Sequence, residues 1–94
     1  MFPLGCRPRL LLGEVVITKQ ASAVISNEDV QGALRRVTHG DWGEIRGDDV
    51  TQNEKALQDG GCLLAVFRSA NGTAFWVITE IKLSVTTVIL PEEY

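Results

Sequence analysis

A histidine, two carboxylates and an indole lie close together in the stretch HGDWGEI, residues 39–45. His39 has the chemistry of a general base, and Asp41 or Glu44 could orient its ring, as acid–base catalysis requires. The stretch holds neither a serine nor a cysteine that could serve as a nucleophile in a strained elbow. The spacing of His39 and Asp41 also fits neither a helical metal pair nor a zinc knuckle. The stretch therefore offers a base without a nucleophile or a metal site.

The same residues also meet the requirements of a corner between two helices. His39 near a helix C-terminus would complement the helix dipole, and Gly40 would supply a left-handed turn. Asp41 can accept hydrogen bonds from loop amides. Trp42 would be an apolar plug whose indole N–H needs a carbonyl or water as partner. We interpret residues 39–45 as such a corner, with a catalytic role as the alternative.

Glu80 is the most anomalous carboxylate, because it ends an otherwise apolar run. The dipeptide Asn71-Gly72 separates two β-rich segments and predicts a type I′ hairpin. Its two-residue turn would pair Leu63 with Glu80 and place the carboxylate on the same face as Trp76. A carboxylate among apolar groups has a raised pKa unless it is paired, and such groups cluster at functional sites.

The helix expected beside this hairpin would add polar groups to the same wall. Asn53 falls on the apolar stripe of that helix, and Glu54 lies at the edge of the stripe. A buried amide must find hydrogen-bond partners, and a few polar groups in an apolar wall are typical of a ligand pocket. We therefore predict a candidate ligand site formed by Glu80, Asn53, Trp42 and Glu54. The alternative is that Glu80 lies at the sheet edge and meets a basic residue or water.

Hydrophobic periodicity predicts the elements that position these residues. Residues 1–9, with two prolines and a glycine, predict an irregular tail, and residues 10–94 predict a single α+β domain. Ser26 precedes acidic residues and an apolar stripe of helical period, which predicts a helix ending at Gly40. The expected fold is an N-terminal strand and two or three helices packed on a three-stranded antiparallel meander. Strands are expected at 10–17, 62–69, 73–80 and 85–90, and helices at 20–25, 26–40 and 48–59.

Both faces of the predicted hairpin are apolar, which bears on assembly. One layer of helices covers only one face of a sheet. The second face therefore needs either the N-terminal segment or another copy of the chain, and we favour another copy. The residues expected at this homo-oligomer interface are Val66, Val77, Phe75 and Leu64.

The composition narrows the function classes. The chain has 94 residues and a net charge of −3, which argues against nonspecific binding to duplex DNA. No stretch approaches the roughly 20 apolar residues of a membrane span, and we expect a cytoplasmic protein. Cys6 and Cys62 are too few for a disulfide framework and lack metal-ligand spacing. We expect Cys62 to be a buried thiol, and we expect no cofactor and no metal.

Four segments, HGDWGEI, NEKALQDGG, FWVITE and SVTTVILPEEY, together resemble one family of short bacterial proteins carried on plasmids and integron gene cassettes. The resemblance covers residues 12–94 and rests on GDWGE and TTVILPEEY occurring in that order. It implies an α+β domain, carriage on a mobile genetic element and self-association, and it implies no particular activity. Some members are labelled as the modification subunit of a type I restriction system. A methyltransferase needs a glycine-rich cofactor loop that this chain lacks, so we expect no such activity.

Three classes of function follow. The leading hypothesis is a non-enzymatic, self-associating module that binds a partner protein or a small molecule. The alternative is a small hydrolase-like enzyme that uses Glu80 with Asn53 or His39. A nucleic-acid accessory factor is the third class, and it would need a basic stripe, whereas the sequence offers only two arginine pairs, at residues 7 and 9 and at residues 35 and 36.

Overall fold

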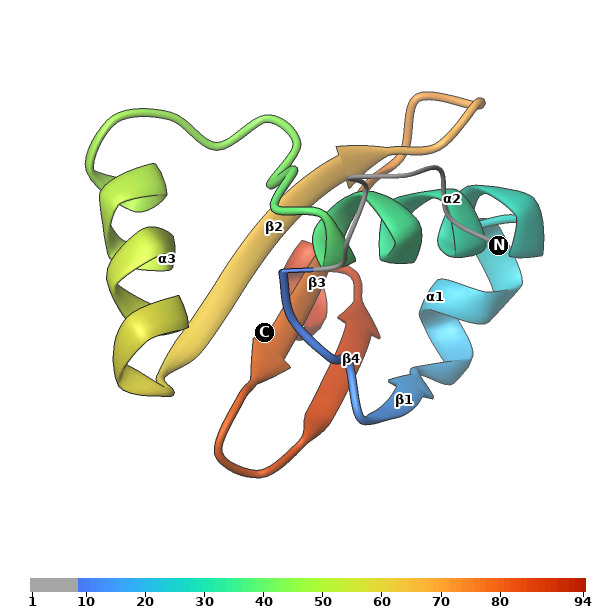
Figure 1. The fold of residues 1–94 in the computed structure, drawn as a ribbon. Coiled ribbons are helices and arrows are strands. Elements are labelled where there is room, and N and C mark those ends of the chain that lie inside the picture. Colours follow the sequence, from blue (N-terminus) through green and yellow to red (C-terminus); the bar gives the residue numbers. More distant parts are fainter. Residues whose placement is uncertain (1–8) are drawn as a thin grey trace, which may run out of the picture.

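The computed structural model describes residues 9–94 as one mixed sheet with three helices (Figure 1). The elements are β1 (Glu14–Ile17), α1 (Lys19–Val24), α2 (Asn27–Thr38), α3 (Asp48–Asp59), β2 (Cys62–Arg68), β3 (Ala74–Glu80), β4 (Val85–Ile89) and the 3₁₀ turn η1 (Pro91–Glu93). The predicted α+β class is confirmed, and each expected helix and strand is present. The irregular tail expected at residues 1–9 lies, apart from Arg9, outside the described residues.

The sheet has four strands rather than the three of the predicted meander. Its order is β1-β4-β3-β2, with β1 parallel to β4 and the other pairs antiparallel. The N-terminal strand therefore joins the sheet instead of packing on it. Gly13 makes this possible, because its φ of +68° turns the chain against Ser84, and a Cβ there would lie 2.0 Å from the Ser84 carbonyl oxygen. The same turn delays the start of the expected strand, so β1 begins at Glu14 rather than at residue 10.

The hairpin register differs by one residue from the prediction. The Gly72 amide donates to the Ser69 carbonyl and the Ser69 amide donates to the Thr73 carbonyl, both at 2.9 Å. Gly72 has a φ of +87°, whereas Asn71 does not have a positive φ, so the type I′ turn is wrong. The connection is a three-residue loop with a left-handed glycine, and it pairs Cys62 with Glu80.

This shift reassigns every side chain of β3 relative to β2. Phe67 faces Phe75 across the pair, with ring centroids 6.0 Å apart. Arg36 of α2 lies over the Phe67 ring at 4.7 Å, so α1 and α2 cover this face, the inner face (Figure 1). The inner-face side chains of β2, β3 and β4 are buried: Leu63, Ala65, Phe67, Phe75, Val77, Thr79, Thr86 and Val88.

The structure contradicts two of the four residues predicted for the homo-oligomer interface. Val77 and Phe75 are each 1% exposed inside the core, because the true register turns them toward the helices. Leu64 and Val66 lie on the opposite, outer face, where they are half-buried. The expectation that the second face of the hairpin is also apolar is confirmed, with Trp76 and Ile78 as its β3 members.

Candidate functional site

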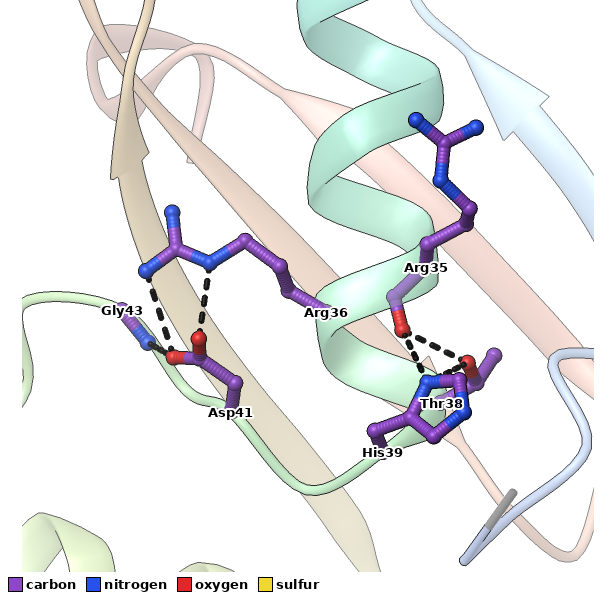
Figure 2. A network of polar contacts seen from close by, with 6 residues as sticks. All are labelled: Arg35, Arg36, Thr38, His39, Asp41 and Gly43. Carbon is purple, nitrogen blue, oxygen red and sulfur yellow. Dashed lines mark hydrogen bonds and ion pairs between the residues drawn. The ribbon is translucent and has the colours of Figure 1, made fainter. Parts of the chain in front are cut away.

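The stretch 39–45 forms the corner between α2 and the loop that leads to α3 (Figure 2). His39 is the C-terminal cap of α2, and its Nδ1 lies 2.8 Å from the Arg35 carbonyl oxygen and 3.2 Å from the Thr38 hydroxyl. Gly40 has a φ of +86°, as expected of a left-handed turn. The geometry predicted for a corner is thus confirmed at both positions.

Asp41 is held by an arginine rather than by the histidine. Its carboxylate accepts from Arg36 Nε at 2.7 Å, from an Arg36 terminal nitrogen at 3.3 Å and from the Gly43 amide at 3.0 Å. These bonds, that of Arg36 above all, hold the pKa of Asp41 below its ordinary range. Figure 2 shows the Asp41 and His39 side chains pointing in different directions from the loop. Asp41 therefore closes the corner and does not orient a base.

The other carboxylate of the stretch is also engaged. Glu44 forms an ion pair with Arg68, with 3.0 Å between Glu44 Oε2 and Arg68 Nε. The two carboxylates that could orient His39 thus both bind arginines. The catalytic alternative for residues 39–45 loses the base–carboxylate pairing on which it depended.

Trp42 fills the corner, as predicted, but its polar partner is different. The side chain is 5% exposed, and its indole N–H donates to Glu54 Oε2 at 3.1 Å. The expected partner was a carbonyl or water. Arg9 binds the same carboxylate with two nitrogens, at 2.5 and 3.2 Å. The cluster of Arg9, Trp42 and Glu54 therefore joins the N-terminal segment, the corner and α3.

Glu54 links this cluster to the stability of the protein in acid. The Arg9 guanidinium, and after it the Trp42 indole, hold the pKa of Glu54 below its ordinary range. A lowered carboxylate pKa in the folded state stabilises the protein at higher pH, and this contribution is lost as the pH falls through the ordinary value of about 4.3 and below. We expect Glu54→Gln to lower the melting temperature at pH 7 by at most a few degrees, since exposed ion pairs contribute about 0–1 kcal/mol.

The difference in melting temperature between the wild type and Glu54→Gln should narrow toward zero as the pH falls below about 4. Thermal unfolding followed by circular dichroism from pH 3 to pH 7 measures it. Glu92→Gln, at an exposed glutamate of η1, is the matched control. A Glu54→Gln difference that stays constant over this range would contradict the linkage.

Asn53 is a structural amide that seals the edge of β2. It is 3% exposed, its amide nitrogen donates to the Leu64 carbonyl at 2.7 Å, and its oxygen accepts from the Leu64 amide at 3.1 Å. The prediction that a buried Asn53 must find partners is confirmed. Two residues along, the Val66 amide donates to the Trp42 carbonyl at 3.1 Å, and the Val66 carbonyl accepts from the Glu44 amide at 2.8 Å. The Asn53 side chain and the corner loop together close this edge of the sheet.

Glu80 lies elsewhere. It pairs with Cys62 and Val85 on the outer face, so the predicted pairing with Leu63 is wrong. Cys62 is exposed, which corrects the expected buried thiol. Partial burial, and then the nearby charge of Glu80, raise the pKa of the Cys62 thiol.

The predicted four-residue ligand site is thus divided in the structure. Trp42 and Glu54 are in contact, and Asn53 is adjacent to Glu54 on α3 but bonds the β2 backbone. Glu80 belongs to the outer face and shares none of these hydrogen bonds. In the hydrolase-like combination, Asn53 bonds Leu64 and His39 lies against Arg35, and no hydrogen bond among residues 9–94 joins either of them to Glu80.

The structure also contains a concave region that the sequence pattern did not predict. A groove of about 340 Å³ lies between β1 and α2, and it is lined by Leu12, Val15, Gln31, Leu34, Arg35 and Thr38. The helical spacing of residues 31, 34, 35 and 38 was the available signal. The parallel pairing of β1 with β4, which brings β1 beside these α2 residues, could not be inferred from that spacing.

No protein-family model, curated protein or solved structure matches the chain. Over residues 9–94, no group of three or more His, Cys, Asp or Glu side chains is arranged to hold a metal ion. In the same range, no helix has the length and apolar composition to cross a membrane.

Proposed function

We propose that the protein is a self-associating interaction module in which the outer sheet face binds the outer face of a second copy. The observation that carries this proposal is that apolar side chains of neighbouring strands align in rows across that face. The strand pairing aligns Val16, Thr87, Ile78 and Leu64 in one row across all four strands, and Ile89, Trp76 and Val66 in the next. These side chains are half-buried, apart from Val16, which is 44% exposed.

The charges at the two ends of the face favour a second copy as the occupant. Glu14 and Glu80 belong to the row beyond Leu64 at one end, and Arg68 belongs to the row beyond Val66 at the other. A two-fold axis across the strands reverses the strand direction in the partner. It places the acidic end of one copy opposite Arg68 of the other, and it superposes the two apolar centres.

The size of the face sets the strength expected of the dimer. Strands about 4.8 Å apart and up to about 20 Å long give a four-stranded face on the order of 400 Å². Protruding side chains and the rim around the face add to this area. The accessible surface buried by two such faces then reaches the low end for stable interfaces, about 1,200 Å² in total. We expect a reversible dimer at micromolar concentration. Carriage on a mobile genetic element, and a partner protein or small molecule for this dimer, stay predictions.

Sedimentation equilibrium of the wild type and of Ile78→Glu tests the proposal. Ile78 lies at the centre of the outer face, so a charge there should weaken dimerisation at least about tenfold and leave the secondary structure unchanged. The control is Val24→Glu, at a valine of α1 that is 44% exposed and does not belong to the outer face. A wild type that stays monomeric across micromolar concentrations, or equal weakening by both variants, would refute the outer-face dimer.

A further inference from the structure

We propose that the open edge of β1 and the groove beside it bind an extended acidic peptide by strand addition. This site is separate from the outer face and does not depend on the dimer. It combines unpaired backbone groups, an apolar floor and one cationic side chain, and each comes from a different part of the structure.

The backbone of β1 offers an unpaired edge. In its parallel pairing with β4, the Glu14 amide donates to Ser84 at 2.8 Å and the Thr18 amide donates to Val88 at 3.1 Å. Because alternate residues of a strand direct their backbone groups to opposite sides, Val15 and Ile17 turn theirs away from β4. Within residues 9–94, no hydrogen bond outside the β1–β4 ladder reaches them. Val15 is 39% exposed.

The β2 edge, on the opposite side of the same sheet, differs from the β1 edge because its outward backbone groups are hydrogen-bonded. On β2, Asn53 bonds Leu64 and the corner loop bonds Val66, so the outward backbone groups of both residues are satisfied. Folded proteins usually cover such edges, because an open strand is a template for another strand. One edge of this sheet is thus closed by dedicated contacts, and within residues 9–94 no such contact closes the other.

The groove would receive the side chains of an added strand. It runs between β1 and α2, with Leu12, Val15 and Leu34 contributing its apolar part. In strand addition, backbone hydrogen bonds supply affinity and alternate side chains enter pockets that supply specificity. A peptide paired with β1 would direct every second side chain into this groove, beneath α2.

Arg35 at the rim of the groove selects an acidic peptide. Among residues 9–94, the ion pairs formed by arginines involve Arg9, Arg36 and Arg68 but not Arg35. Figure 2 shows the Arg35 guanidinium directed away from the network around Asp41. A glutamate on the groove side of a peptide would complement this charge.

The same charge argues against a second copy of β1 as the occupant. Antiparallel pairing of two β1 edges about a two-fold axis would place both α2 helices on one side of the joined sheet. The two Arg35 side chains would then line a common groove, where like charges repel. A separate peptide brings no such repulsion.

Fluorescence anisotropy with two labelled peptides tests the site. The probe is Gly-Thr-Val-Thr-Glu-Thr-Val-Thr-Gly, whose two valines and glutamate share one face of a strand, and the matched probe has lysine in place of glutamate. The wild type should bind the glutamate peptide at least about tenfold more tightly, and Arg35→Glu should reverse this preference. Arg46→Glu, a charge reversal at another exposed arginine, should leave the preference unchanged.

Val15→Pro tests the backbone contribution. Proline removes the outward N–H of Val15 while the amides that bond β4 remain, so binding of both peptides should be lost with the fold retained. Equal binding of the two peptides by the wild type, or no binding of either, would overturn the proposal. So would a lower oligomeric mass for Val15→Pro than for the wild type, because a second copy would then occupy the edge.

Discussion

Replacing Trp42 with alanine will lower the free energy of unfolding by about 3–5 kcal/mol, the range for truncation of a buried aromatic side chain. Trp42 is 5% exposed in the core cluster, and it is the apolar centre of the corner between α2 and α3. Its removal leaves a cavity and also takes away the N–H that binds Glu54. Urea unfolding followed by circular dichroism measures the loss.

Two further variants separate the contributions at the corner. Trp42→Phe keeps much of the apolar contact and removes the indole N–H, so it should cost less than Trp42→Ala. His39→Ala should cost far less than either, since its side chain contributes a hydrogen-bond contact with the Arg35 carbonyl, worth about 0.5–1.5 kcal/mol. A Trp42→Ala loss as small as that of His39→Ala would show that the corner does not depend on the indole.

Asn53→Ala is expected to cost about 2–4 kcal/mol, because both backbone groups of Leu64 lose their partners at a buried edge. The affected groups belong to β2, so the variant should also expose a strand edge and aggregate more readily. Urea unfolding and light scattering on the same samples measure the two effects.

Asn53→Asp distinguishes hydrogen bonding from packing at the same position. A carboxylate can accept from the Leu64 amide but cannot donate to the Leu64 carbonyl, so it should destabilise at least as much as alanine. Gln52→Ala changes an exposed neighbour on α3 and should stay within about 0.5 kcal/mol of the wild type. Equal effects of Asn53→Ala and Gln52→Ala would mean that the amide does not hold the β2 edge.

Local signals in the sequence predicted the helices well. The cap at Ser26 is confirmed, since its side chain accepts from the Asp29 amide at 3.1 Å. The apolar stripe that follows it is buried as expected: Val30, Ala33, Leu34 and Val37. These features depend on residues three to seven positions apart, which a linear pattern records directly.

The predicted hairpin register was wrong because contacts between the loop and distant parts of the chain determine the register. Asn-Gly favours a two-residue turn locally, but here the Ala70 amide donates to Asp29 at 2.9 Å and the Asn71 side chain donates to the Val24 carbonyl at 3.4 Å. These bonds anchor the loop to α1 and α2. The longer loop that results reverses which β3 residues face the helices.

The candidate site was predictable only in part for a related reason. Trp42 and Glu54 were both selected from the sequence, but Arg9 stands 45 positions before Glu54 and no pattern links the two. Glu80 was placed with them through the wrong hairpin register. The groove beside β1 depends on the parallel pairing with β4, which the sequence does not encode within any short segment.

The pairing of β1 with β4 also has a consequence for the order of folding. Glu14 pairs with Val85, so almost the whole described chain must be brought together before this ladder can form. The hairpin of β2 and β3 closes over a few residues, and loop-closure entropy favours such local contacts early. We expect the hairpin to form first and β1 to dock late. In the native state β1 is then among the first elements to detach, and its departure would expose β4 as a new edge.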